Sequence, residues 1–143
     1  MTDPIHSPPF SVLRIDHVVL RVKDAERAIA FYRDVLGCAV ERRREHLGLV
    51  HLRAGTNLID LVTLDGPLGK QGGALPGKEG RNVDHICLRI EPFDEAAIRA
   101  LMARYGVQVN GEVQNNFGAE GDGPSIYITD PDGNGIELKG AAG

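Results

Sequence analysis

Two octets of the sequence repeat each other and constrain the fold more than any other feature. Residues 15–22 read Ile-Asp-His-Val-Val-Leu-Arg-Val, and residues 83–90 read Val-Asp-His-Ile-Cys-Leu-Arg-Ile. Asp, His, Leu and Arg recur in register, and most of the other positions carry the β-branched residues that favour strands. The two copies begin about half a chain length apart in a chain of 143 residues. We therefore expect two related halves, the first of which opens with a strand whose apolar run is typical of burial on both faces.

The segment after the first octet has helical periodicity and is followed by three short strand patterns. Asp24 is a predicted N-cap, apolar residues recur at helical spacing as far as Leu36, and Gly37 stands where a helix ends. Glycine-containing turns then separate three strands, which are expected at 38–45, 49–53 and 58–64. The first half therefore has the order βαβββ.

The second half follows the same plan. A helix is predicted between Asp94 and Gly106, and a weak strand follows at 107–113. The glycine-rich stretch 114–123 is predicted to be a loop and a candidate lid over a binding site. The remaining strands are expected at 125–129 and 135–139. An Asp-Pro-Asp-Gly-Asn segment between them is a tight-turn sequence.

These patterns predict an α+β protein made of two βαβββ modules. The stretch 65–81 contains six glycines and is unsuited to a regular element, so we interpret it as a linker. The predicted divisions are an N-terminal arm, a first module, the linker and a second module, at residues 1–12, 13–64, 65–81 and 82–140. A long linker also makes the exchange of modules between two chains feasible.

The composition argues against several classes of protein. A net charge of −4 gives no electrostatic footprint for nucleic acid, and no apolar run approaches the ~18 residues that cross a membrane. Cys38 and Cys87 are too far apart for a CxxC motif, and residues 1–10 lack the apolar stretch of a signal peptide. We therefore expect a cytoplasmic protein that binds a small-molecule substrate, with no nucleic-acid or membrane partner.

One histidine and one carboxylate recur at matching places in the two halves. Because strand side chains alternate between faces, His17 and His85 point to the same side of equivalent strands. Asp60 and Glu137 lie in the last strand of each half. If the modules pack about a pseudo-twofold axis, the four side chains face one cavity. Imidazoles combined with carboxylates suit one divalent ion of Fe, Mn, Ni, Co or Zn, and they suit Ca or Mg poorly.

An ordinary structural role is the alternative for each of these residues. A histidine in an apolar strand is often a hydrogen-bonded core residue, and Glu137 is a possible ion-pair partner of Lys139. The recurrence of both residue types at matched positions favours the metal site. By the same alternation of faces, Arg21, Arg89 and Tyr127 are candidate substrate contacts in the cavity, or framework residues beside it.

Four motifs together resemble the vicinal oxygen chelate superfamily, which includes glyoxalase I, fosfomycin- and bleomycin-resistance proteins and extradiol dioxygenases. These motifs are Ile-Asp-His at 15–17, Phe-Tyr-x-x-Val-Leu-Gly at 31–37, Asp-Pro-Asp-Gly-Asn at 130–134 and Ile-Glu-Leu at 136–138. The likeness covers residues 13–139, and the stretch 118–130 is most similar to small glyoxalase-domain proteins. It implies a U-shaped sheet around a central cavity with one divalent metal ion, commonly in a homodimer.

The resemblance also implies roles for individual residues. His17, Asp60, His85 and Glu137 match the four metal-ligand positions of bacterial glyoxalase I, which has Glu where this chain has Asp60. The shorter side chain leaves open whether the site has four protein ligands or three. In a glyoxalase-like lyase or isomerase, the substrate chelates the metal through two neighbouring oxygens and a carboxylate ligand moves the proton. Glu137 is the first candidate for that carboxylate and Asp60 is the second.

Two other functions are alternatives. An extradiol-type dioxygenase uses Fe(II) and an additional acid–base histidine, for which His51 is a candidate, although an exposed strand histidine is the simpler interpretation. A non-enzymatic protein like the bleomycin-resistance proteins sequesters a small molecule. Those proteins typically lack the metal ligands that this chain retains.

Overall fold

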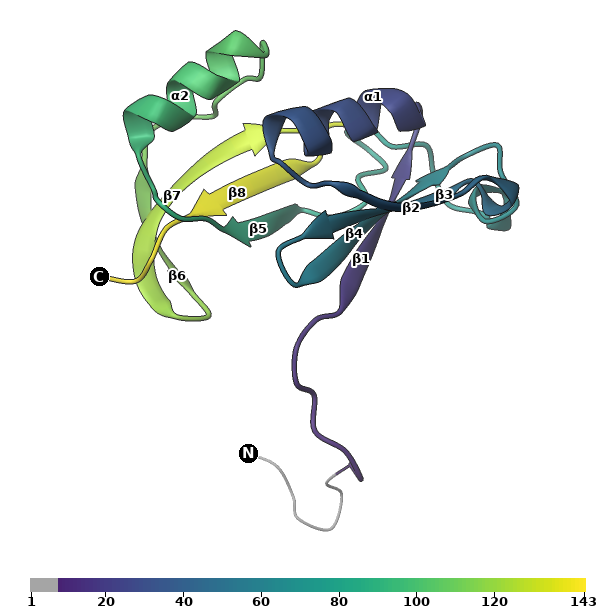
Figure 1. Ribbon diagram of the computed structural model, residues 1–143, viewed down its shortest axis with the longest axis horizontal. Helices are drawn as coiled ribbons and strands as arrows, with labels where there is room; N and C mark the ends of the chain where they lie inside the picture. The colour runs from purple at the N-terminus through teal and green to yellow at the C-terminus, as the bar shows by residue number, and fades with distance from the viewer. Residues whose placement is uncertain (1–7) are drawn as a thin grey trace.

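The computed structural model describes residues 8–143, and the earlier part of the predicted N-terminal arm lies outside them. Within this range the strands form two four-stranded sheets, one from each half of the chain. The helices α1 and α2 lie on the same side of the two sheets (Figure 1). The predicted α+β class and the plan of two βαβββ modules are confirmed.

The first half forms a sheet with the strand order β1-β4-β3-β2. Its elements are β1 (His17–Val22), α1 (Ala25–Ala30), β2 (Val40–Arg44), β3 (Leu49–Ala54) and β4 (Asn57–Thr63). As predicted, Asp24 caps α1, because its carboxylate accepts the backbone N–H of Arg27. The helix continues as a π-helical turn at Phe31–Val35, and the chain reverses at Gly37, whose φ of +74° favours glycine.

The second half repeats this topology with the strand order β5-β8-β7-β6. Its elements are β5 (His85–Arg89), α2 (Glu95–Arg104), β6 (Gln114–Gly118), β7 (Gly121–Thr129) and β8 (Gly135–Lys139). In both sheets the first strand pairs in parallel with the last strand of the module, and the remaining neighbours are antiparallel. Short 3₁₀ turns at Glu45–Leu47 and Gly69–Gln71 complete the described elements.

Two predictions for the second half are wrong. The strand expected at 107–113 is reduced to a single bridge between Val109 and Ile128. The loop expected at 114–123 is the β6–β7 hairpin, so it is not a free lid. β6 contains Gln, two Asn and Gly, which are poor strand formers. Its extended form depends on pairing with β7 across a tight turn, which the propensities of the β6 residues themselves do not report.

One hydrophobic core spans both halves of the molecule. It lies between the helices and the sheets, where Leu20 and Val22 of β1 meet Ile29 of α1, and all three side chains are fully buried. The opposite face of β1 is open, since His17 is exposed and Val19 is 50% exposed. The expectation that the first octet is buried on both faces is therefore wrong for this chain, and the faces of the sheets away from the helices are available for a site.

The seam between the modules is polar and buried. The predicted turn between β7 and β8 is present, and the Asp130 carboxylate closes it by accepting the backbone N–H groups of Asp132 and Asn134. The Tyr32 hydroxyl, from the first module, donates to the same carboxylate at 2.5 Å. Lys23 N–H donates to Asp132 across the seam. Burial, and then the nearby Asp130, raise the pKa of Tyr32 well above its usual value, so this hydroxyl keeps its proton.

Candidate metal centre

The first half-site lies on the open face of the first sheet. Strand register places Asp60 of β4 directly beside His51 of β3, and the two side chains share a face. His51 Nδ1 lies 2.8 Å from Asp60 Oδ1, and His17 Nε2 lies 3.9 Å from Asp60 Oδ2. Asp60 is only 4% exposed, so its carboxylate is held close to the sheet between two imidazoles.

The second half-site occupies the equivalent place in the second sheet. Glu137 of β8 lies beside Tyr127 of β7 in the same register that relates Asp60 to His51. His85 Nε2 lies 3.2 Å from Glu137 Oε1. Glu137 is 5% exposed, so each half of the molecule presents one half-exposed imidazole beside one buried carboxylate.

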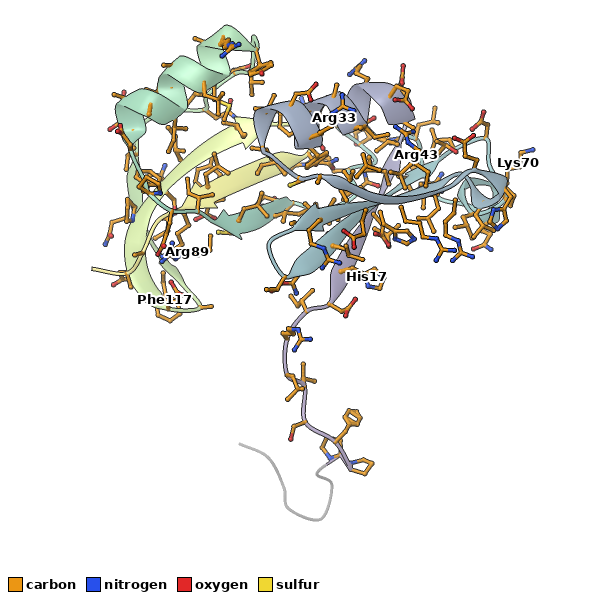
Figure 2. All side chains as sticks on the ribbon, in the orientation of Figure 1. His17, Arg33, Arg43, Lys70, Arg89 and Phe117 are labelled. Atoms are coloured by element: carbon orange, nitrogen blue, oxygen red, sulfur yellow. The ribbon has the colours of Figure 1, made fainter. Side chains whose placement is uncertain are left out.

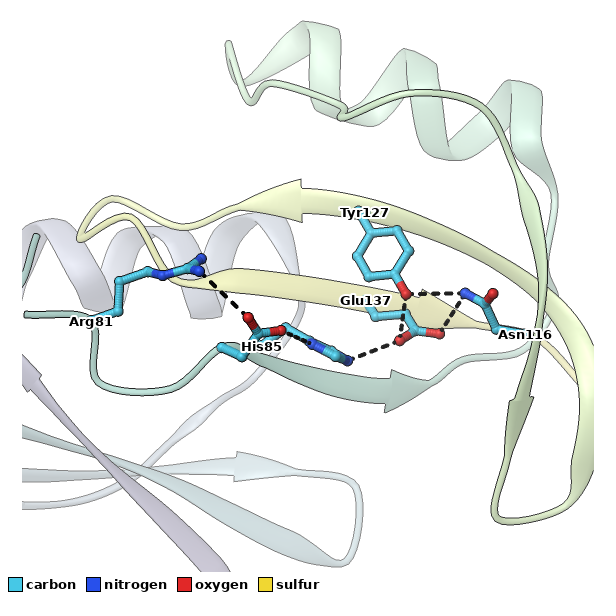
Figure 3. A network of polar contacts seen from close by, with 6 residues as sticks. Arg81, His85, Asn116, Tyr127 and Glu137 are labelled. Atoms are coloured by element: carbon cyan, nitrogen blue, oxygen red, sulfur yellow. Dashed lines mark hydrogen bonds and ion pairs between the residues drawn. The ribbon is translucent and has the colours of Figure 1, made fainter. Parts of the chain in front are cut away.

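A dense set of donors surrounds Glu137 (Figure 3). Tyr127 donates its hydroxyl to Oε1 at 3.0 Å, while Ser125 and Asn116 donate to Oε2 at 2.6 Å and 3.3 Å. Burial by itself raises the pKa of Glu137, but these hydrogen bonds outweigh it and the net pKa is lower than usual. Glu137 is therefore an anion near neutral pH. Lys139, its possible ion-pair partner, donates instead to the Gly121 carbonyl.

Both histidines are oriented by the aspartate that precedes them in the repeated octet. His17 Nδ1 lies 2.8 Å from Asp16, and His85 Nδ1 lies 2.8 Å from Asp84. A carboxylate only accepts hydrogen bonds, so Nδ1 donates the proton in each contact, and Nε2 is the ring nitrogen left facing the buried carboxylate of its half-site. A metal-binding histidine usually donates its second ring nitrogen to such a carboxylate. The Asp16 hydrogen bond is also the main cause that raises the pKa of His17.

The donor chemistry of the two half-sites therefore fits a divalent transition-metal ion. Each half-site offers an imidazole Nε2 and a carboxylate, the mixed set that suits Fe, Mn, Ni, Co or Zn. Within residues 8–143, however, no group of three or more His, Cys, Asp or Glu side chains is arranged to hold one ion. The structure brings the four predicted ligands together as two pairs, and their action as one set stays a prediction.

The predicted substrate contacts have framework partners in the structure. Arg21 donates to the carbonyls of Gly69 and Gly73 in the linker, and Arg89 donates to Glu120 at the tip of the β6–β7 hairpin. Figure 2 shows His17, Arg89 and Phe117 on the side of the molecule away from the helices. Roles of Arg21, Arg89, His51 and Tyr127 in substrate binding stay predictions.

Sequence reasoning missed four residues that touch the predicted ligands. Asp16 and Asp84 were visible as part of the repeated octet, because they recur in register with the histidines. Ser125 and Asn116 carry no such signal, since their contact with Glu137 depends on the pairing of β6, β7 and β8. Cys87 also shares this face, and burial followed by the charge of Glu137 raises its pKa to about 11, which makes its thiol a poor nucleophile.

Comparison with known proteins identifies the family. A family model described as the Glyoxalase/Bleomycin resistance protein/Dioxygenase superfamily matches residues 14–138. The chain therefore belongs to this superfamily, as its motifs predicted. The crystal structure of virulence protein STM3117 from Salmonella typhimurium superposes with a TM-score of 0.73 at 26% identity, covering 93% of this chain and 100% of that one.

Relatives with named activities are found among the curated proteins. Virulence protein STM3117 is 35% identical over 88% of this chain and 83% of its own length. Lactoylglutathione lyase of Salmonella typhimurium is 31% identical over 88% of this chain and 91% of its length. Mitochondrial methylmalonyl-CoA epimerase of Mus musculus is 29% identical over 93% of this chain and 75% of its length. The superfamily of this chain therefore includes enzymes.

In the described part of the chain, neither helix has the length and apolar character needed to cross a membrane.

Proposed function

We propose that this protein is a divalent-metal-dependent lyase or isomerase that moves a proton on a carbon next to a carbonyl group. The observation that carries this proposal is the repeated pair of an imidazole and a buried carboxylate. The histidine Nε2 lies 3.9 Å from a carboxylate oxygen in the first sheet and 3.2 Å from one in the second. The relatives support it, because they include an epimerase, which is an isomerase, and a lyase, namely methylmalonyl-CoA epimerase and lactoylglutathione lyase.

The proposed ligands are His17, Asp60, His85 and Glu137. A bound ion would act as a Lewis acid for two neighbouring substrate oxygens, which lowers the energy of the enolate-like anion formed when the proton leaves. The residues themselves supply the remaining chemistry. The aspartates that precede the histidines orient each ring so that Nε2 faces the half-site, and the carboxylates of Glu137 and Asp60 are the candidate proton acceptors.

The direct test combines a metal measurement with a proton-exchange measurement. Metal-free protein is reconstituted separately with Ni²⁺, Co²⁺, Zn²⁺, Mn²⁺ and Fe²⁺. It is then assayed for lactoylglutathione formation, for methylmalonyl-CoA epimerisation and for deuterium uptake from D₂O into those substrates. Activity with at least one ion, lost in both His85→Ala and Glu137→Gln, is expected. Binding of no ion, or no turnover and no exchange with any of them, would contradict the proposal.

A homodimer is the assembly we propose for this enzyme. Several apolar side chains of the segment before β1 stand exposed, namely Phe10, Val12, Leu13 and Ile15. Val19 on the open face of β1 is also half exposed. We propose that a second copy covers these residues and that the first half-site of one chain then faces the second half-site of the other, which would complete the four-ligand set.

Mixing two inactive variants tests this assembly. In a heterodimer of His17→Ala and Glu137→Ala chains, a site shared between chains would have one intact copy, made from the unaltered module of each chain. Recovery of activity on mixing, together with a dimeric mass by light scattering, is the expected result. No recovery in confirmed heterodimers would place each site within one chain, and a monomeric mass in the active enzyme would exclude the dimer.

The other two functions receive no specific support from the site. His51, which the dioxygenase alternative needs at an open coordination position, is engaged with Asp60. A non-enzymatic binder has no need for two equivalent imidazole–carboxylate pairs. Oxygen uptake by the Fe²⁺-loaded protein with catechols is the measurement that would revive the first alternative.

A further inference from the structure

We propose that Ser125, assisted by Asn116, is a positioning residue that holds Glu137 in its metal-binding orientation. The second half-site, His85 with Glu137, would then be the preorganised part of the metal centre, and the first half-site would be the part that adjusts when the ion binds. This inference rests on the proposed function and specifies which side chains outside the ligand set the metal centre needs.

The two oxygens of Glu137 have separate surroundings. Oε2 accepts the Ser125 hydroxyl at 2.6 Å and the Asn116 amide at 3.3 Å, whereas Oε1 faces His85 Nε2 at 3.2 Å and accepts the Tyr127 hydroxyl. Oε2 is thus anchored to the framework, and Oε1 lies beside the proposed metal-binding nitrogen. The Ser125 side chain is fully buried, and its hydroxyl makes a short bond to a charged acceptor, a strong kind of hydrogen bond in proteins.

The anchor is built from rigid elements. Ser125 lies in the central strand β7, which pairs with β8 on one side and with β6 on the other. Asn116 reaches Glu137 from β6, so donors from two adjacent strands converge on a carboxylate carried by the third. Donors mounted on paired strands hold their geometry better than donors on loops. Glu137 therefore has little freedom to rotate before a metal ion arrives.

The first half-site lacks this anchor. Leu49 occupies the position in β3 that corresponds to Ser125 in β7, two residues before the partner of the carboxylate. A leucine offers no hydrogen-bond donor, and Asp60 is held by His51 through Oδ1 alone. Asp60 Oδ2 faces His17 at 3.9 Å, beyond hydrogen-bond range. Because only Glu137 is anchored in this way, we infer that the second half-site is the preorganised one.

The test is a titration of the metal-free protein with Co²⁺, in which binding is monitored by the visible d–d absorption of the ion. Ser125→Ala is compared with wild type, with Ser125→Thr, which retains the hydroxyl, and with the matched control Thr129→Val. Thr129 is in the same strand, but its hydroxyl accepts a hydrogen bond from Asn110 and does not touch Glu137. Thermal unfolding of each metal-free variant is measured in parallel.

We expect Ser125→Ala to weaken Co²⁺ binding by about 10- to 100-fold, in the range found when an outer hydrogen bond to a metal ligand is lost. The absorption spectrum of Co²⁺ bound to Ser125→Ala is expected to differ from that of wild type. Ser125→Thr is expected to recover most of the Co²⁺ affinity, and Thr129→Val is expected to bind Co²⁺ like wild type. Asn116→Ala, whose side chain is less buried, provides a second variant if Ser125→Ala does not fold, and a smaller loss of affinity is expected from it.

Wild-type affinity in Ser125→Ala and Asn116→Ala would overturn the inference while leaving the proposed function intact. Equal weakening in Ser125→Ala and Ser125→Thr would also overturn it, because packing rather than the hydroxyl would then be responsible. A wild-type protein that binds neither Co²⁺ nor any of the other ions would remove the proposed function and this inference with it.

Discussion

The two halves of this molecule share a topology but hold their carboxylates differently. Asp60 and Glu137 have the same place in their sheets, in register with His51 and Tyr127. Asp60 is held by one imidazole, whereas Glu137 receives hydrogen bonds from three side chains on two neighbouring strands. A repeated backbone therefore preserves where an acid lies, while neighbouring side chains decide how firmly it is held.

The same contrast appears at the arginines of the two octets. Arg21 donates to two carbonyls of the linker, and Arg89 donates to Glu120 at the tip of the β6–β7 hairpin. Each arginine binds another segment of the chain to its strand, but the two segments come from different parts of the chain.

The largest expected effect concerns the seam that keeps the two halves in one core. Asp130→Ala removes a buried carboxylate that accepts hydrogen bonds from Tyr32, Asp132 and Asn134, so we expect about 3 kcal/mol of lost stability. Urea unfolding of the metal-free protein measures this loss. Tyr32→Phe removes a single hydroxyl and is expected to cost about 1–2 kcal/mol. If Asp130→Ala lost less stability than Tyr32→Phe, the turn would not be what joins the two halves.

The second prediction separates the two carboxylates. Because Glu137 is preorganised and Asp60 is not, Glu137→Gln is expected to weaken metal binding by more than about 100-fold, and Asp60→Asn by about 10-fold. Isothermal titration with Zn²⁺ or Co²⁺ measures both affinities. Equal losses would erase the proposed difference between the half-sites, and a larger loss from Asp60→Asn would reverse it.

The third prediction concerns the outer carboxylates of the octets. Asp84→Ala is expected to lower metal affinity by about 10-fold, since His85 would lose the acceptor that fixes its Nδ1 proton. Asp16→Ala should act on His17 in the same way. Both aspartates are largely exposed, so we expect a loss of metal affinity at the low end of the 10- to 100-fold range found when an outer hydrogen bond to a metal ligand is removed. Unchanged affinity in both variants would show that the strands alone orient the rings.

The smallest expected effect is a pH dependence of the metal-free protein. The folded-state pKa of Glu137 lies below its ordinary value of 4.5, so its ionised form contributes stability above that pH. This contribution is lost as the pH falls through the lower folded-state pKa. The stability difference between wild type and Glu137→Gln should therefore shrink on acidification below pH 4.5 in urea unfolding experiments. A difference that stays constant with pH would mean that the hydrogen bonds of Glu137 do not favour its ionised form.

Much of the fold was predictable because its signals are local or repeated. The two octets correspond to β1 and β5, and Asp24 and Asp94 cap the two α-helices. The Asp-Pro-Asp-Gly-Asn segment forms the turn between β7 and β8. β6 was missed, since its polar and glycine-rich sequence becomes a strand only through pairing with β7. The open face of β1 was missed as well, because an apolar strand does not reveal which face receives the helices.

The sequence by itself determined the family, the two-module plan and the residue types of the candidate site, because alternation of strand faces and a recurring histidine need no distant contact to be recognised. Only the tertiary structure decided how those residues are held. The convergence of Ser125, Asn116 and Tyr127 on Glu137 arises from strand pairing, and the buried link from Tyr32 to Asp130 arises from packing between modules. The contacts with Glu137 join residues 10 to 21 positions apart and the Tyr32–Asp130 link joins residues 98 positions apart, and neither kind of pairing leaves a periodic trace in the sequence.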